Sequence, residues 1–257
     1  MEHTKSLPVI KFDNEFHDST DCVIKEDRLS VYLNGKKIIS TMCILDSQEA
    51  YAVGFLMSEA VINDVDDITD IYLSADGLNV YMDAKINEDN MSNLYHEKTL
   101  TSGCCVGVSA NFEGKIIGKF ISSKNTFRID ELIHYMTIFN QKTYLFDSTG
   151  CVHKVMLFFD GKIYCSEDIG RHNALDKTLG KARLNNIDTS KALLIVSGRL
   201  SMEMVVKCAM HDIPIVISRA AATALAIQSA NKLGITLVGF ARDNCFNIYT
   251  HNGRIKM

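Results

Sequence analysis

The sequence predicts an α/β protein, with a layered domain built on a mixed sheet and a smaller N-terminal α+β domain. Beyond about residue 145, strand-like and helix-like segments alternate, which is typical of a sheet covered by helices. The runs LLIVS, PIVIS and TLVGF in that half are almost entirely apolar, as expected of strands buried on both faces. We therefore expect a smaller α+β region over 1–100, a cysteine loop and connecting helix over 101–145, and an α/β portion carrying the ligand site over 146–257.

The first elements expected are a hairpin and a helix. Residues 22–45 alternate in strand fashion around Asn34-Gly35, a dipeptide that favours tight hairpin turns. Asp46 then has the position of a helix N-cap, and Glu49 is placed to complete a capping box. The apolar residues that follow predict a helix over roughly 47–62.

A second hairpin and a second helix are expected before residue 145. Residues 69–84 predict two strands around Asp76-Gly77. A polar, irregular stretch follows over 85–100, and the dense segment TSGCCVG comes next. Apolar side chains recur on one helical face over 129–140, which predicts an amphipathic helix.

The α/β portion supplies most of the predicted strands. Strands are expected at 153–159, 162–166, 192–197, 213–217, 235–240 and 246–250. Helices are expected at 173–183, 201–211 and 222–233. Since strands and helices alternate here, part of the sheet should be parallel.

Length and composition exclude several classes of protein. With 257 residues, of which 47% are hydrophobic and 23% charged, the chain can bury a sizeable core. A net charge of −4 gives no general attraction to nucleic acid or to anionic membranes. No apolar run reaches the length of a membrane span, and the N-terminal residues lack the apolar stretch of a signal peptide. We therefore expect a cytoplasmic protein with no nucleic-acid or membrane partner.

Of the eight cysteines, only Cys104 and Cys105 are close in sequence. No pair has CxxC spacing, so the sequence predicts no structural zinc site and no metal ligands. Without a secretion signal, a disulfide framework is not expected either. Most of the remaining cysteines lie in apolar runs, where we expect them to be buried as small hydrophobic side chains.

Arginines are concentrated in the C-terminal half. Six of the eight follow residue 170, and Arg171, Arg199, Arg219 and Arg242 come shortly after predicted strands. Ligands of open α/β sheets bind outside the carboxyl ends of the parallel strands, where helix N-termini also favour anions. Because guanidinium groups bind phosphate through two parallel hydrogen bonds, this pattern predicts a localised site for a nucleotide or pyrophosphate.

A second interpretation of the arginines needs no ligand. Each could instead cap a loop or pair with a nearby acid, of which the candidates are Asp168, Glu203 and Asp243. The sequence alone leaves this alternative open for any single arginine.

Several segments together resemble the FdhD family. The segment SEDIGRHNALDKTLGKA (166–182) resembles the family's signature, and the similarity continues from VSGRLS to GFAR (196–242). Upstream, SVYLNGKKI, AYAVGFLMSEAV and TSGCCVG resemble the family's N-terminal region and cysteine loop. The resemblance covers roughly residues 23 to 250.

This resemblance implies a function in the maturation of formate dehydrogenase. Members of the family accept sulfur from a cysteine desulfurase as a persulfide and transfer it to the molybdenum bis(molybdopterin guanine dinucleotide) cofactor, which they bind as a substrate. They also bind guanine nucleotides, their larger domain is similar to the cytidine deaminase fold, and they are often homodimers. The family's cofactor-binding stretch corresponds here to Phe240, Ala241, Arg242, Asp243, Asn244 and Cys245.

The cysteine loop departs from the family's pattern. Cys104 matches the first cysteine of the usual CxxC motif, whereas Gly107 stands where the second is expected and Cys105 is an added neighbour. Persulfide transfer needs an exposed, mobile and acidic thiol, and Gly103 and Gly107 let this loop change conformation. Cys104 is therefore the expected persulfide carrier, with Cys105 as an auxiliary thiol or an inward-facing side chain.

The signature segment contains further candidates. His172 could donate a hydrogen bond to phosphate or to a pterin carbonyl, or could be a structural histidine near a helix start. Asp168 and Asp176 could orient Arg171 and His172 or accept N–H bonds from a guanine edge. The remaining expectations are solvated side chains for Glu167 and Lys177, an N-cap at Asn173, and phosphate contacts or caps at Ser197 and Ser201.

Two other functions stay open at this stage. The altered cysteine loop is compatible with a chaperone that binds the guanine dinucleotide cofactor without moving sulfur. A nucleotide-acting enzyme on a deaminase-like fold is the other possibility. Zinc deaminases need an H-x-E element followed by P-C-x-x-C, and the sequence has neither, which argues against hydrolytic deamination.

Overall fold

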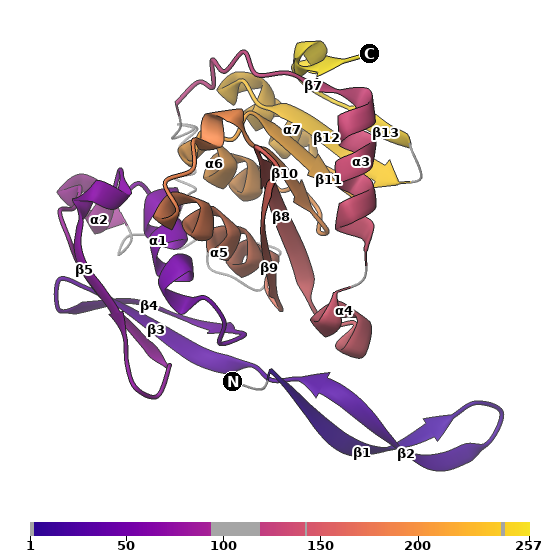
Figure 1. Cartoon of the computed structure of the whole chain (residues 1–257). Helices are drawn as coiled ribbons and strands as arrows, with labels where there is room; N and C mark the ends of the chain where they lie inside the picture. Colours follow the sequence, from indigo (N-terminus) through magenta and orange to yellow (C-terminus); the bar gives the residue numbers. More distant parts are fainter. Residues whose placement is uncertain (1–2, 94–118, 142, 243–244) are drawn as a thin grey trace.

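The computed structural model describes residues 3–93, 119–141, 143–242 and 245–257. Its largest sheet has six strands in the order β13-β12-β11-β10-β8-β9 (Figure 1). The middle strands β10, β11 and β12 are parallel, whereas β8, β9 and β13 run antiparallel to their neighbours, so the sheet is mixed as predicted. The bounds are β8 His153–Phe159, β9 Lys162–Asp168, β10 Leu193–Val196, β11 Ile215–Ser218, β12 Thr236–Arg242 and β13 Cys245–Ile248.

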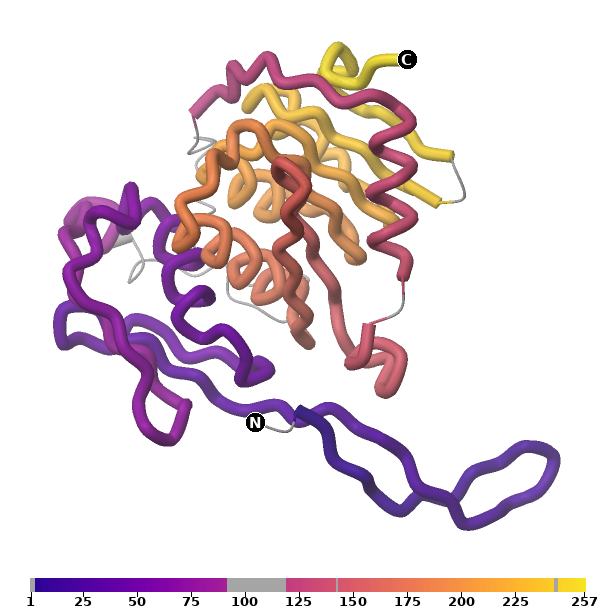
Figure 2. Tube along the Cα trace, viewed as in Figure 1, coloured from indigo at the N-terminus to yellow at the C-terminus, as the bar shows by residue number. Residues whose placement is uncertain are grey.

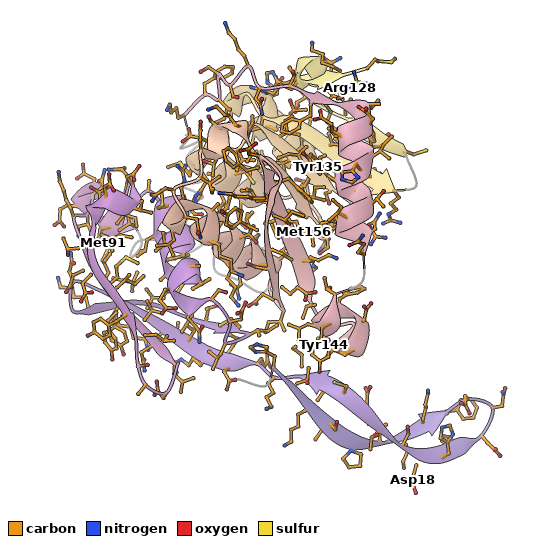
Figure 3. All side chains as sticks on the ribbon, viewed as in Figure 1. Asp18, Met91, Arg128, Tyr135, Tyr144 and Met156 are labelled. Atoms are coloured by element: carbon orange, nitrogen blue, oxygen red, sulfur yellow. The ribbon has the colours of Figure 1, made fainter. Side chains whose placement is uncertain are left out.

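Helices cover both faces of this sheet, α5, α6 and α7 on one face and α3 on the other (Figure 1). Side chains of β8 alternate between the two layers, because Val155 and Leu157 join the first core and Met156 and Phe158 join the second. Tyr135 of α3 stacks on Phe158 with ring centroids 4.5 Å apart. Tyr135 and Met156, another side chain of this second core, are labelled in Figure 3. The helix bounds are α3 Ile129–Asn140, α5 Arg171–Leu184, α6 Met202–Met210 and α7 Ala224–Leu233.

The N-terminal part builds a second sheet and packs it on one helix. Four strands follow the order β4-β3-β6-β5, and α1 (Gln48–Ser58) covers the sheet with its apolar side chains. Both predicted hairpins are present, and the parallel pairing of β3 with β6 joins them into one sheet. The strands are β3 Asp27–Leu33, β4 Lys36–Cys43, β5 Ile68–Leu73 and β6 Asn79–Ala84.

The first hairpin turn is confirmed, but the predicted cap of α1 is wrong. Asn34 and Gly35 have φ angles of 49° and 74°, the positive values that a type I′ turn requires. The N-cap of α1 is Ser47 rather than Asp46, and its side chain makes no capping hydrogen bond. The Asp46 carboxylate instead accepts a hydrogen bond from the Ser47 hydroxyl at 3.0 Å.

The two domains meet where α1 crosses α5, at two glycines. A β-carbon at Gly180 would lie 1.8 Å from the carbonyl oxygen of Ala50, and one at Gly54 would lie 1.9 Å from that of Asp176. Real β-carbons do not approach backbone atoms this closely. The absence of a side chain at both positions therefore lets the two helices pack backbone against backbone.

A two-stranded arm projects from the body of the molecule (Figure 2). It consists of β1 (Thr4–Phe12) and β2 (Phe16–Ile24), and its outer end carries Ile10, Phe12 and Phe16 with 72%, 63% and 77% of their surface exposed. This arm was not predicted, because the first hairpin was expected to begin at residue 22, close to the end of β2.

Several short elements complete the described chain. A short helix occupies the start of the stretch that we expected to be irregular, and another precedes β8. No helix among the described residues is long and apolar enough to cross a membrane. These elements are α2 Glu88–Asn93, α4 Tyr144–Thr149, the paired strands β7 Phe127–Arg128 and β14 Ile255–Lys256, and the 3₁₀ turns Val65–Asp67, Thr189–Lys191 and Asn252–Arg254.

Candidate functional site

Three of the candidate arginines lie at the carboxyl ends of the three parallel strands. Arg199 follows β10, Arg219 follows β11 directly, and Arg242 is the last residue of β12. All three side chains are exposed. The Arg242 Nε donates a hydrogen bond to the carbonyl oxygen of Arg219 at 3.0 Å. The structure therefore gathers three guanidinium groups at one edge of the sheet, where α/β proteins commonly bind their ligands.

Arg171 lies at the same edge because β8 and β9 run antiparallel. β9 ends opposite His153, and Arg171 then opens α5. Burial, and next the positive charges of Arg171 and Arg199, lower the pKa of His153. A β-carbon at Gly198 would lie 3.3 Å from His153 Nδ1 and 3.4 Å from Arg171 Cδ, so this glycine allows both side chains to approach the end of β10. The positive charge around His153 makes this part of the edge suitable for an anion.

The structure does not support pairing of these arginines with Asp168 or Glu203. Asp168 pairs with Lys177, and Glu203 Oε2 lies 3.5 Å from His172 Nε2. The third candidate partner, Asp243, lies outside the described residues.

His172 lies inside the protein and not on the exposed edge. Only 4% of its surface is accessible, and burial, followed by the charge of Lys207, lowers its pKa to about 3. The ring is therefore neutral at physiological pH. Within the described part of the chain, its Nε2 has no hydrogen-bond partner. His172 is positioned as a buried neutral side chain beneath Arg171 and not as a surface donor to phosphate.

Our expectations for the rest of the signature segment were mostly wrong. Lys177 is fully buried, and its Nζ donates to Asp168 Oδ2 at 2.6 Å and to the carbonyl oxygen of Ile44 at 2.7 Å. Asn173 lies within α5, whose N-cap is Gly170, and its amide donates to Asp168 Oδ1 at 3.0 Å. These residues form a buried network. Because Ile44 follows β4, a strand of the N-terminal sheet, the network binds the N-terminal domain to α5.

Of the other candidates from the same region, Ser201 lies at a helix N-cap, which was one of its two predicted positions, whereas Asp168 and Glu167 are placed differently from the prediction. Asp168 accepts hydrogen bonds within that buried network and does not orient Arg171 or His172. Glu167 is half-buried and accepts a hydrogen bond from the Thr143 hydroxyl. Ser197 Oγ accepts a hydrogen bond from the backbone N–H of Lys154 at 3.0 Å. Ser201 occupies the N-cap of α6 without a capping bond from its side chain.

A second buried network, which was not predicted from the sequence, surrounds Lys207. Its Nζ donates to Asp176 Oδ2 at 2.7 Å and lies 3.7 Å from Glu59 Oε1. Asp176 also accepts a hydrogen bond from the Ser58 hydroxyl at 2.9 Å, so it does not orient Arg171 or His172. Burial raises the pKa of Glu59 to about 7. A lysine on the largely apolar helix α6 could have indicated a buried charge. Its partners Asp176 and Glu59 could not be identified, because they lie far from Lys207 in the sequence.

The cysteines that burial affects are poor candidates for a reactive thiolate. Burial raises the pKa of Cys43 to about 12 and that of Cys165 to about 11, and it raises the pKa of the fully buried Cys208 as well. Cys151, which we expected to be buried, is exposed, and so is Cys245 of the predicted cofactor-binding stretch. Cys104 and Cys105 lie outside the described residues. Among the described residues, no three His, Cys, Asp or Glu side chains are grouped to hold a metal ion.

The cofactor-binding stretch implied by the family resemblance lies at the end of β12 and the start of β13. Phe240 is 47% exposed and has a φ angle of 54°, at a point where the pairing register shifts between Gly239 and Arg242. Ala241 is buried in the core beneath α3. Asp243 and Asn244 lie outside the described residues.

A pocket opens beside this stretch, between α3 and the strands β12 and β13. Its volume is about 430 Å³, and Arg242 and Cys245 both line it. We call the sheet edge that carries Arg171, Arg199, Arg219 and Arg242 the cationic edge. The pocket lies at one end of it, next to Arg242.

The described structure therefore defines an α/β protein whose mixed sheet carries a cationic edge and an adjoining pocket. Comparison with known proteins identifies its family. The model of the FdhD/NarQ family matches residues 24–256, so the chain belongs to the FdhD/NarQ family.

The relatives and a solved structure agree with this membership. A sulfur carrier protein FdhD of Wolinella succinogenes is 54% identical over 241 residues, covering 93% of this chain and 84% of the relative. The proteins of the same name from Bacillus pumilus and Staphylococcus aureus are 34% and 32% identical, covering 95% and 96% of this chain and 94% and 95% of their own lengths. A crystal structure from Desulfotalea psychrophila, described as a formate dehydrogenase accessory protein, has the same fold, with a TM-score of 0.79, 23% identity and coverage of 99% of this chain and 100% of that chain.

Proposed function

We propose that this protein is a sulfurtransferase in the maturation of formate dehydrogenase. It accepts persulfide sulfur from a cysteine desulfurase and passes it to the molybdenum bis(molybdopterin guanine dinucleotide) cofactor, which it binds as a substrate. The observation that carries the proposal is the 54% identity, over 93% of the chain, to a protein named sulfur carrier protein FdhD. The cationic edge supports it, because the cofactor carries pyrophosphate groups.

Cys104 is the proposed sulfur carrier. Its thiolate attacks the outer sulfur of the donor's persulfide, the S–S bond of the donor breaks, and the donor cysteine leaves as a thiolate. The new bond makes Cys104 a persulfide, so sulfur moves without a net change in redox state. Cys43 and Cys208 are buried with raised pKa values, which leaves them unsuited to this chemistry.

The proposed binding site for the cofactor is the cationic edge with its adjoining pocket. Arg199, Arg219 and Arg242 are available to grip phosphate oxygens, and Arg171 contributes its charge from the N-terminus of α5. Phe240 and Cys245 extend the site on either side of Arg242. We further propose that the protein acts in the cytoplasm as a homodimer, and that its larger domain has the layering of cytidine deaminases.

The sulfur-transfer step is tested by mass spectrometry. After incubation with a cysteine desulfurase and cysteine, the wild-type protein should gain about 32 Da on the peptide containing Cys104, the mass of one sulfur atom, and reductant should remove it. The Cys104→Ala variant should not acquire the adduct, whereas Cys105→Ala should still acquire it. A wild-type protein that never gains this mass, although the desulfurase itself carries a persulfide, would contradict the proposal.

The cofactor-binding step is tested by titration with GDP, which stands in for the guanine nucleotide end of the cofactor. Arg242→Ala should weaken GDP binding by about 1.5–3 kcal/mol, because a charge-assisted contact with phosphate is lost. Arg128→Ala is the matched control, since Arg128 is an exposed arginine paired with Asp130 outside the site. Equal GDP affinity in wild type and Arg242→Ala would remove this edge from the binding site.

One specific observation favours a second function. Gly107 occupies the place of the second cysteine in the family's loop. A protein with this loop could bind the cofactor as a chaperone and leave sulfur transfer to another protein. GDP binding that depends on Arg242, together with no adduct on Cys104, would support this alternative.

A further inference from the structure

His153 lies where β8 begins and its two neighbours β9 and β10 end. It is the first residue of β8, and its register partner is Asp168, the last residue of β9. Its ring also reaches the segment that follows β10, since its Nδ1 lies 3.3 Å from the hydroxyl oxygen of Ser197. The side chain is half-buried. His153 is therefore part of the cationic edge, although it is not one of the arginines that define it.

Two of these arginines act on the ring. A β-carbon at Gly198 would lie 3.3 Å from His153 Nδ1 and 3.4 Å from Arg171 Cδ, so the two side chains are neighbours across this glycine. Arg199 is the next residue along the chain, and its positive charge acts on His153 in the same sense as that of Arg171. The imidazole thus lies beside two guanidinium groups that belong to different segments.

The other titratable groups near the ring offset little of this positive charge. Asp168 is negative, but it is fully buried and its carboxylate is 2.6 Å from the ammonium group of Lys177. His172 is neutral, because burial lowers its pKa to about 3. Burial, followed by the charge of Arg171, lowers the pKa of His153 itself, so without a ligand the ring is neutral at physiological pH.

The contact with Ser197 suits both protonation states of the ring. Ser197 Oγ accepts a hydrogen bond from the backbone N–H of Lys154 at 3.0 Å, which leaves its own proton and one lone pair for Nδ1. The hydroxyl can donate to Nδ1 of the neutral ring and can accept from Nδ1–H of the charged ring. In both states Nε2 carries a proton, and it makes no hydrogen bond with any described residue. Nε2–H is therefore the donor that His153 offers to a ligand.

We infer that His153 is an anion-binding residue of the cationic edge, and that it takes up a proton when a phosphate group binds there. The anion offsets the positive charges of Arg171 and Arg199, which otherwise oppose protonation of the ring. The proton comes from the solvent and binds at Nδ1, and the resulting imidazolium donates from Nε2 to the anion in a charge-assisted hydrogen bond. The inference rests on the proposed function, because it takes this edge to be where the phosphates of the cofactor bind.

Proton uptake on binding has a necessary consequence for affinity. A ligand that raises the proton affinity of a group must itself bind more tightly as that group becomes protonated. Binding of an anion should therefore strengthen as the pH falls, and release of the anion should return the proton to the solvent. This coupling makes His153 a proton-linked contact, in contrast to the arginines, which stay charged throughout.

The test uses inorganic sulfate and the full chain. The charge of sulfate stays constant over the range in which histidine titrates, whereas a terminal phosphate titrates there itself. Sulfate binding, followed by NMR of the histidine rings at constant ionic strength, should tighten by roughly tenfold between about pH 8 and about pH 5. The titration midpoint of the His153 ring should also move to higher pH when sulfate is present.

Three variants identify the groups responsible. His153→Gln keeps polar atoms beside Ser197 but cannot be charged, so it should bind sulfate less tightly, most of all at acidic pH, and should show little pH dependence. Arg199→Ala should weaken sulfate binding at every pH. His134→Gln is the matched control, because His134 is an exposed residue of α3 on the other face of the sheet, and it should keep the wild-type pH dependence.

The outcomes separate this inference from the proposed function. If sulfate binding depends on Arg199 but has the same pH dependence in wild type and His153→Gln, only the inference is overturned. The same holds if the midpoint of the His153 ring does not move at saturating sulfate, or if GDP binding depends on Arg242 while sulfate leaves the His153 resonance unchanged. If wild type binds neither GDP nor sulfate, the proposed cofactor site fails and this inference fails with it.

Discussion

Replacing Lys177 by methionine should destabilise the protein by about 3–5 kcal/mol, the cost of leaving a buried charge without its partner. Lys177 and Asp168 are both fully buried, and their charged atoms are 2.6 Å apart. Methionine fills a similar volume, but the Asp168 carboxylate then keeps only backbone and amide donors. The variant also loses the hydrogen bond from Lys177 to the carbonyl oxygen of Ile44.

Chemical denaturation of wild type and variant measures this cost. The matched control is Lys232→Met on α7, where the lysine is exposed and the change should stay within about 0.5 kcal/mol. The double variant Asp168→Asn, Lys177→Met removes both charges and should recover part of the lost stability. A cost below about 1 kcal/mol for Lys177→Met alone would show that the pair is not a structural requirement.

The signature segment is mainly structural. Asp168, Asn173 and Lys177 come from the most characteristic stretch of the sequence, yet they bind the backbone of the N-terminal domain. Asn173 donates to the carbonyl oxygen of Met42 at 3.0 Å, and the backbone N–H of Ile44 donates to Asp168 at 3.1 Å. The segment therefore joins the two domains, and it leaves Arg171 at the cationic edge.

Elements whose signal is local could be predicted from the sequence. The helix expected over 129–140 has those bounds, and so does the strand expected over 153–159. The helix has a strong periodic pattern of apolar residues, and the strand contains the continuous apolar run from Val155 to Phe159. The edge position of the arginines followed from strand and helix alternation, because parallel strands place their carboxyl ends together.

Features that depend on distant residues could not be predicted. The arm formed by β1 and β2 has no buried face, so its strands carry no clear alternation of apolar and polar residues. Lys177 appeared to be a solvated helix residue because its backbone partner, Ile44, is 133 positions away. The α3 wall of the pocket depends on which face of the sheet the helix covers, and the periodicity of α3 does not reveal this.

A methyl group at Gly180 should also have a large effect, because it would be placed within the backbone of α1. The added β-carbon would lie 1.8 Å from the carbonyl oxygen of Ala50, and a helix backbone cannot yield as a side chain does. The two helices must separate, which costs about 3 kcal/mol or more, at the upper end of overpacking. Gly253→Ala is the matched control, because a β-carbon there meets no atom within 4 Å.

Gly54 provides the internal test of this explanation. Gly54→Ala should cost about as much as Gly180→Ala, because its β-carbon would lie 1.9 Å from the carbonyl oxygen of Asp176. If one close crossing explains both effects, a single separation of the helices relieves both clashes, and the double variant should cost clearly less than the sum. Strict additivity in urea unfolding would mean that the two glycines act independently. Separation of the helices would also move the N-terminal domain relative to α5, which begins at Arg171. The stability of the α1–α5 contact and the geometry of the cationic edge should therefore change together.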